Sequence, residues 1–229
     1  MKKYRDIFKK KNTLLVVIHA ESLAQVEKNL RICYDAEVDG VFLINHSMTA
    51  MAINDIFHEV KSIFPIPFIG LNLLRLSAHA AVNLVPVTAS GLWVDNAGVR
   101  EEDLSYAQSN WEFLKTTRKI WDGLYFGGVD FKYHTPEKNL PKISALAKNY
   151  MDVVTTSGVA TGKAPDIHKI ETMRKAIGDF PLAVASGITP ENVKNYTDLV
   201  DCFLVATGIS KSFTELDQKK VQNLVKLLN

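Results

Sequence analysis

Short apolar stretches rich in β-branched residues alternate with longer amphipathic stretches from one end of the chain to the other. Most of the short stretches are apolar along their whole length, which is typical of parallel strands that helices cover on both faces. We predict strands at residues 13–19, 40–45, 67–72, 91–95, 123–128, 152–157, 181–186 and 201–207.

The longer stretches have the residue spacing of helices with one apolar face. Leu23, Val26, Leu30 and Cys33, for example, fall on a single stripe. Thr189 and Pro190 together form a helix start signal, with Thr189 as N-cap and Pro190 in the first turn. We predict helices at residues 22–35, 102–120, 167–177, 191–196 and 213–228.

Two α/β architectures are compatible with this alternation, a closed (β/α)8 barrel and a doubly wound open sheet. Eight strands in 229 residues favour the barrel, which usually needs roughly 250 residues. No GxGxxG turn follows the first strand, where an open dinucleotide-binding sheet would need it. We therefore predict a single TIM-barrel domain over residues 1–229, of the phosphate-binding type.

Composition and charge agree with an ordinary globular domain and narrow the range of partners. Hydrophobic residues make up 47% of the chain and the net charge is +2, too small a charge to indicate nucleic-acid binding. The basic start of the chain predicts a solvated first helix. The apolar run at residues 13–18 is too short to span a bilayer, and no signal peptide is visible. We expect a cytoplasmic protein with reduced cysteines and no membrane insertion.

Polar side chains recur where the predicted strands end. In a barrel these carboxyl ends form the mouth, where the chemistry takes place. Any strand becomes polar where it leaves the core, but recurrence at every exit favours a functional mouth. The residues at these exits that we take as candidates are His19, Asn45, Asn72, Arg75, Asp95, Asp130, Lys132, Thr156, Ser157, Ser186 and Thr207.

The sharpest local signal is a pair of glycine turns after the last two strands, Ser186-Gly187-Ile188 and Thr207-Gly208. In each, a hydroxyl residue precedes glycine and a predicted helix start. Glycine lets backbone N–H groups approach an anion closely, and a helix N-terminus adds positive partial charge. Phosphate sites of this fold commonly form from these two loops. We predict that both turns bind one phosphate group.

A further glycine-rich loop, Gly158 to Lys163, follows the sixth strand. It is one residue too short for a Walker A loop, and Ala164 stands where that motif requires Ser or Thr. We predict a mobile lid whose Lys163 closes over the bound anion; a plain connection is the alternative. Thr156, Ser157 and Gly158 would then contact the substrate, as would Asn72 and Arg75.

Five residues are candidates for catalysis. Lys132 suits an electrostatic clamp, a proton-transfer group or a Schiff-base amine, unless it is an exposed rim lysine. Asp95 and Asp130 suit a general acid and base, although Asp95 is equally suited to capping a loop. His19 suits a general base or a purely structural mouth residue, and Asn45 would orient substrate hydroxyls.

The histidines show no zinc-binding spacing, and no metal or cofactor is predicted, although a weak Mg²⁺ site on Asp95 and Asp130 stays open.

Several segments resemble the BtpA-like family of phosphate-binding barrel proteins. They are VVIH at 16–19, EVDGVFLINH at 37–46, GLNLLR at 70–75, DVVTTSGVATGK at 152–163, ASGITPENV at 185–193 and FLVATGISK at 203–211. The resemblance spans almost the whole chain and implies a (β/α)8 fold with phosphate bound at Ser186-Gly187 and Thr207-Gly208. It implies no particular reaction. Ile44 replaces a glutamate common in that family, and an Asp-x-His-x-Lys-His pattern is lost at 128–133, where Lys132 alone is kept. These losses put a metal site in doubt.

The prediction from these observations is an enzyme acting on a phosphorylated sugar or nucleotide-like metabolite. Lyase, isomerase and glycosyl or phosphoribosyl transfer chemistry all stay open. The alternative is a non-catalytic ligand-binding or assembly factor, since a fold does not fix a function and the family is named for a photosystem I biogenesis factor. Apolar positions on the first and last helices suggest a homo-oligomer.

Overall fold

The computed structural model describes residues 3–117 and 120–229, and its centre is a closed barrel of eight parallel strands. Neighbours along the chain are neighbours in the sheet, and β1 closes the ring by pairing with β8, with Val16 opposite Val205. The (β/α)8 prediction is confirmed. The strands are β1 (Thr13–His19), β2 (Gly40–Ile44), β3 (Ile69–Asn72), β4 (Gly91–Val94), β5 (Leu124–Gly128), β6 (Val153–Ser157), β7 (Leu182–Ala185) and β8 (Cys202–Val205).

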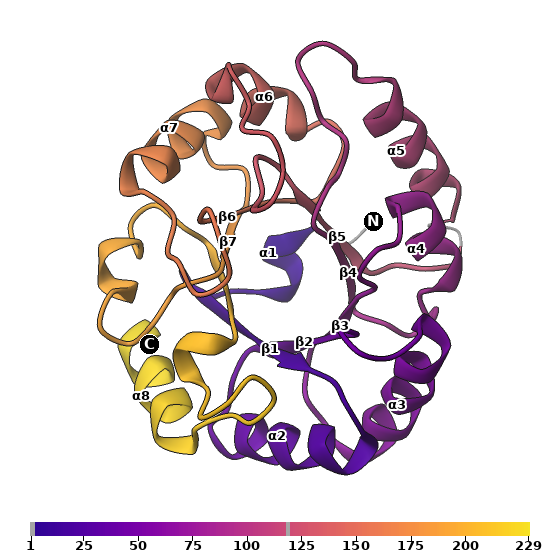
Figure 1. The fold of residues 1–229 in the computed structure, drawn as a ribbon, viewed down its shortest axis with the longest axis vertical. Helices are drawn as coiled ribbons and strands as arrows, with labels where there is room; N and C mark the ends of the chain where they lie inside the picture. Colours follow the sequence, from indigo (N-terminus) through magenta and orange to yellow (C-terminus); the bar gives the residue numbers. More distant parts are fainter. Residues whose placement is uncertain (1–2, 118–119) are drawn as a thin grey trace.

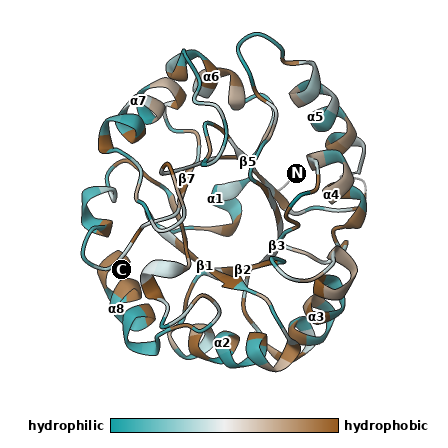
Figure 2. Cartoon of the chain, in the orientation of Figure 1, coloured by the Kyte–Doolittle hydropathy of each residue, from teal (hydrophilic) through white to brown (hydrophobic). Residues whose placement is uncertain are grey.

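Helices surround the barrel on the outside (Figure 1). Ser22, Thr49 and Ser77 cap three of them by accepting a hydrogen bond from the N–H three residues on, which satisfies one otherwise free donor at each start. Apolar colour lies mainly on the helix faces turned towards the barrel (Figure 2). The helices are α2 (Leu23–Asp35), α3 (Ala50–Ile63), α4 (Ala78–Leu84), α5 (Ser105–Thr117), α6 (Leu140–Ala147), α7 (Ile167–Ile177) and α8 (Gln218–Leu228).

Two predicted helices are shorter than expected. The segment 191–196 contains only the 3-10 turn η1 (Val193–Asn195). The last helix begins at Gln218 instead of Phe213, because Asp217 caps it by accepting from the N–H groups of Lys219 and Lys220. The intervening residues form the 3-10 turn η2 (Thr207–Ile209) and a loop pinned by a bridge between Ser210 and Leu216. A long helix therefore follows neither glycine turn directly.

The first residues form a plug instead of a solvated helix. Helix α1 (Tyr4–Ile7) lies in the middle of the ring of strands (Figure 1). Tyr4 and Phe8 are 2% and 6% exposed, and Phe8 packs on Phe68 with ring centroids 5.2 Å apart. The Tyr4 hydroxyl donates to the Asp201 carbonyl at 2.9 Å. The plug closes the end of the barrel where the strands begin.

Alternate residues of the strands supply two separate cores. Val16 and Ile18 pack under the helices, whereas Leu15 and Val17 belong to the core inside the barrel. Large inward-pointing side chains fill the interior from the plug upwards, and the mouth lies at the carboxyl ends of the strands. Within residues 3–117 and 120–229, no helix has the length and apolar character needed to cross a membrane.

We predict that Tyr4→Ala lowers the free energy of unfolding by about 3 kcal/mol, because it empties a buried aromatic site and removes the bond to Asp201. Urea denaturation measures the change. Tyr34→Ala is the matched control, since Tyr34 is 49% exposed and its loss should change stability by no more than about 0.5 kcal/mol. Equal effects of the two substitutions would contradict the role of the plug.

Candidate functional site at the mouth of the barrel

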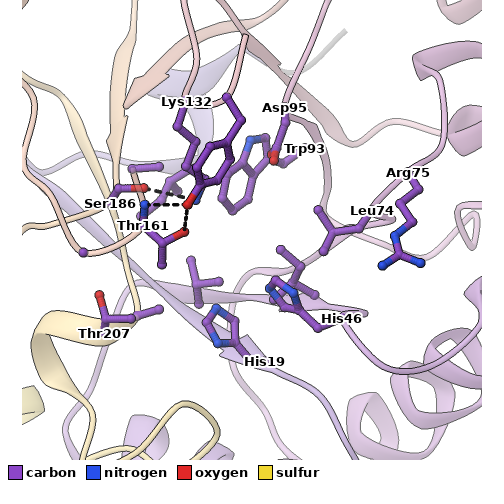
Figure 3. A pocket seen from close by; sticks show the side chains of 17 residues that line it. His19, His46, Leu74, Arg75, Trp93, Asp95, Lys132, Thr161, Ser186 and Thr207 are labelled. Atoms are coloured by element: carbon purple, nitrogen blue, oxygen red, sulfur yellow. Dashed lines mark hydrogen bonds between the residues drawn. The ribbon is translucent and has the colours of Figure 1, made fainter. Parts of the chain in front are cut away.

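A cavity of about 260 Å³ opens at the carboxyl ends of the strands, opposite the plug. All eight strands or their following loops contribute residues to its lining (Figure 3). Its lining residues are Val17, His19, Ile44, His46, Leu74, Arg75, Trp93, Asp95, Lys132, Tyr133, Thr161, Gly162, Ala185, Ser186, Leu204, Ala206 and Thr207. The cavity thus contains His19, Arg75, Asp95, Lys132, Ser186 and Thr207, which the sequence predicted as site residues.

His19 is held as a neutral imidazole at one wall of the cavity. Its Nδ1 lies 2.8 Å from the carbonyl oxygen of Phe213, and a carbonyl only accepts, so Nδ1 carries the hydrogen. The other ring nitrogen, Nε2, is then an acceptor. Burial, reinforced by neighbouring His46, lowers the pKa of His19 to about 4. At neutral pH the ring has a lone pair for a substrate proton.

His46 was not among the predicted site residues, yet its ring lies beside that of His19, with centroids 4.6 Å apart. Phe213 packs against both imidazoles, with its ring centroid 4.1 Å from that of His19 and 5.0 Å from that of His46. Burial first, and then the charge of Lys132, lower the pKa of His46. The only signal in the sequence was its position after a strand, next to Asn45.

Asp95 is the carboxyl group of the cavity, at the end of β4. Burial raises its pKa, although a hydrogen bond from Asn72 and the charge of Lys132 oppose that effect in part. The Asn72 amide donates to Asp95 Oδ1 at 3.0 Å. Asn72 is therefore a support for Asp95 and does not itself line the cavity.

Lys132 reaches across the other side of the cavity towards β7. Its Nζ donates to Ser186 Oγ at 3.2 Å, and its backbone N–H donates to Ser157 Oγ at 2.8 Å. The Phe131 ring lies below the ammonium group, 5.6 Å from it. Ser157 thus fixes the backbone of Lys132 from β6, while Thr156 donates to the carbonyl of Asp130 at 3.3 Å.

Asp130 is held in an ion pair outside this cavity. Lys169 of α7 lies 2.8 Å from its Oδ2, and the N–H of Glu137 donates to its Oδ1 at 2.8 Å. Both carboxylate oxygens are therefore engaged in fixing the loop after β5 to α7. Asp130 does not line the mouth cavity that contains Asp95, although both residues line a separate small cavity of about 20 Å³.

The remaining predicted residues hold the loops or lie at the rim. Asn45 accepts from the N–H of Leu74 at 2.8 Å and donates to the carbonyl of Met48, so it joins two loops. Arg75 lines the cavity at the rim opposite Ser186 and Thr207 (Figure 3). Lys163 is exposed and does not line the cavity.

Three successive loops are stacked at the end of the cavity that Lys132 faces. A Cβ atom on Gly187, whose φ is +67°, would lie 1.9 Å from the N atom of Ala164, and a Cβ on Gly208 would lie 1.9 Å from the carbonyl oxygen of Ile188. A Cβ on Gly158 would lie 2.0 Å from the carbonyl oxygen of Lys163. The two glycine turns are therefore in contact with each other and with the loop after β6.

The backbone donors of these turns are free. No acceptor within the described part of the chain pairs with the N–H groups of Gly187, Ile188, Thr207 and Gly208. Backbone N–H groups are nearly always paired when buried. Gly187 and Ile188 are buried, whereas Thr207 and Gly208 are partly exposed, and the N–H groups of both turns are available to a ligand acceptor. The side chains of Ser186 and Thr207 line the cavity at this end.

Titratable groups do not gather into a metal centre here. Among residues 3–117 and 120–229, His, Cys, Asp and Glu side chains nowhere form a group of three or more able to hold a metal ion.

The fold and the position of its cavity place this chain among the (β/α)8 barrels with a mouth at the carboxyl ends of their strands. The BtpA family model matches residues 125–229, which confirms the resemblance seen in the sequence.

Two relatives match most of the chain. An uncharacterized protein of Methanocaldococcus jannaschii is 24% identical in an alignment of 208 residues, gaps included, that covers 86% of this chain and 75% of the relative. An uncharacterized protein of Pyrococcus horikoshii is 24% identical over 185 residues, 78% of this chain and 71% of the relative.

Solved structures with the same fold include three enzymes of phosphorylated compounds. 3-Hexulose-6-phosphate synthase of Salmonella typhimurium superposes with a TM-score of 0.69 at 16% identity, over 94% of this chain and 98% of that one. (S)-3-O-geranylgeranylglyceryl phosphate synthase of Thermoplasma acidophilum superposes with a TM-score of 0.67 at 14% identity, over 100% of this chain and 99% of that one. Phosphoribosyl anthranilate isomerase of Thermus thermophilus superposes with a TM-score of 0.64 at 12% identity, over 93% of this chain and 96% of that one. At these identities the likeness establishes the fold.

We predict that His19 titrates with a pKa of about 4 in a histidine NMR titration, its signals assigned by their loss in His19→Gln. His168 is an internal control, because Glu171, 3.0 Å away, raises its pKa. A value of 6 or above for His19 would contradict the neutral imidazole.

The same shift predicts how stability depends on pH. The pKa of His19 in the folded protein, about 4, lies below the ordinary 6.5. Between pH 6.5 and pH 4, His19 is therefore protonated in the unfolded chain but neutral in the folded one. Stability contributed by neutral His19 is present above pH 6.5 and is lost as the pH falls towards 4, by about 3 kcal/mol in total. Urea denaturation of the parent protein and His19→Gln between pH 7 and pH 4 measures this difference.

Proposed function

We propose that this chain is an enzyme that acts on a phosphorylated small molecule at the mouth of the barrel. The observation that carries the proposal is the pair of touching glycine turns, whose four N–H groups have no acceptor among residues 3–117 and 120–229. Free backbone donors are suited to phosphate oxygens. Lys132 adds a positive charge at the same end, through its contact with Ser186.

Other residues that line the same cavity supply groups for proton transfer. His19 is neutral with a free Nε2 acceptor, and burial raises the pKa of Asp95. A base and a carboxyl group whose environments move their pKa values in opposite directions are suited to paired proton transfer. Such chemistry beside a bound phosphate corresponds to isomerisation or elimination, and the positive charge of Lys132 would stabilise an anionic intermediate.

The comparisons support this proposal at the level of the fold. The neighbouring structures are a synthase of a hexulose phosphate, a synthase of a glyceryl phosphate ether and an isomerase of a phosphoribosyl compound. Each name contains a phosphorylated compound, and phosphate sites in this fold often use the loops after β7 and β8.

Thr207→Asp is expected to weaken the binding of inorganic phosphate at least tenfold, as measured by isothermal titration calorimetry. A carboxylate about 4 Å from the anion costs several kcal/mol at the effective dielectric constant of a protein surface, and tenfold needs about 1.4 kcal/mol. Ser62→Asp is the control, since Ser62 is exposed near the end of α3. If both variants bind phosphate like the parent protein, the anion does not lie at the turns.

Asp95→Asn is expected to bind the substrate but to slow its turnover at least about 100-fold, the lower range for loss of a general acid or base. Asn keeps an oxygen for the hydrogen bond from Asn72. A thermal-shift screen of phosphorylated metabolites supplies the substrate, and ³¹P NMR follows its conversion.

Asp103→Asn is the control for that variant, because Asp103 is exposed and an amide oxygen still accepts from Ser105. A ligand that binds the parent protein but is never converted would support the non-catalytic alternative instead.

A further inference from the structure

We propose that the phosphorylated substrate has a flat, apolar body about the size of one ring, in place of the polyhydroxylated chain of a sugar phosphate. This inference rests on the proposed function, because it takes the phosphate to lie at the two glycine turns and asks what fills the rest of the same cavity.

The floor of the cavity is apolar. Its side chains come from the ends of β1, β2, β4, β7 and β8, and each is at most 5% exposed. They are Val17, Ile44, Trp93, Ala185 and Leu204. Enzymes of this fold usually carry polar groups at the strand ends, but here the strand ends that form the floor are apolar.

A sugar phosphate would fit this floor poorly. Each hydroxyl that leaves water and finds no hydrogen-bond partner lowers the binding free energy gained. Among these five side chains the only polar atom is Trp93 Nε1. That atom is buried, with no partner among the described residues. It offers one donor, whereas a sugar phosphate brings several hydroxyls, each able to donate and accept.

One wall of the cavity carries two imidazole rings that meet edge to face, with 70° between their planes. The rings of His19 and His46 lie 4.6 Å apart, and Phe213 packs on both and keeps them in place. Trp93 stands across the floor from them (Figure 3). Aromatic rings bind other planar groups well in stacked or edge-on arrangements.

The volume sets the size of the body. A cavity of roughly 150 Å³ holds benzene, so about 260 Å³ accommodates one ring with its phosphate group. Two fused or linked rings would extend past the rim, where Tyr133 is 74% exposed.

The experiment compares four ligands with the same phosphate group. Isothermal titration calorimetry at one pH and ionic strength measures inorganic phosphate, phenyl phosphate, glycerol 3-phosphate and ribose 5-phosphate. Phenyl phosphate is expected to bind at least about tenfold more tightly than each of the other three, from burial of one ring. The preference should disappear in Thr207→Asp together with the affinity.

A pair of isosteric variants locates the ring. Val17→Thr places a hydroxyl on the cavity floor, whereas Val16→Thr places one on the neighbouring position, which packs under the helices. Only Val17→Thr should reduce the ratio of phenyl phosphate to inorganic phosphate affinity, at least about threefold, with inorganic phosphate binding unchanged. Val16→Thr controls for loss of stability.

The outcomes separate the two proposals. Phosphate binding without a preference for phenyl phosphate, or a preference for ribose 5-phosphate, overturns the apolar body and leaves the proposed function standing. A preference that Val17→Thr and Val16→Thr affect equally also overturns it, because the ring is then elsewhere. No binding of any of the four ligands overturns both.

Discussion

The site depends on the close approach of three loops, which the absence of a side chain at two glycines permits. A Cβ on Gly187 or Gly208 would overlap backbone atoms of the adjacent loop at 1.9 Å, so no other residue fits there without displacing the loops. Their contact holds the two turns against each other without a long helix behind either turn. Two 3-10 turns, η1 and η2, are enough to shape the loops.

Around this contact the polar residues divide into those that face the ligand and those that hold the loops. Lys132, Ser186 and Thr207 face the cavity. Ser157 holds the backbone of Lys132, and Asn72 holds Asp95. Catalytic geometry depends on such supports, because a reacting group must be fixed by neighbours that are themselves fixed.

The sequence predicts the barrel well because its strands are marked by apolar runs that local composition makes visible. It also predicts that His19, Asp95 and Lys132 approach one another, because all strand ends of a barrel meet at one mouth.

The sequence cannot predict which strand-end residues turn towards the cavity. Local sequence does not distinguish Asp130 from Asp95; the ion pair of Asp130 with Lys169, on α7, does. Phe213 and His46 depend on a long-range contact between the last loop and the first two strands, which no local pattern encodes. The plug escapes prediction for the same reason, since the contact with Phe68, 60 residues away along the chain, makes Phe8 part of the core.

Burial gives the cavity its chemical character as well as its shape. The interior from the plug up to the floor is lined mainly by apolar side chains. The same burial lowers the pKa of His19 and raises that of Asp95, because in both cases it disfavours the charged form. Lys132 at the rim keeps contact with the anion end through Ser186. Burial thus separates a part of the site suited to charge, at the glycine turns, from a part suited to neutral groups, across the floor. A ligand that fills the cavity must match both parts.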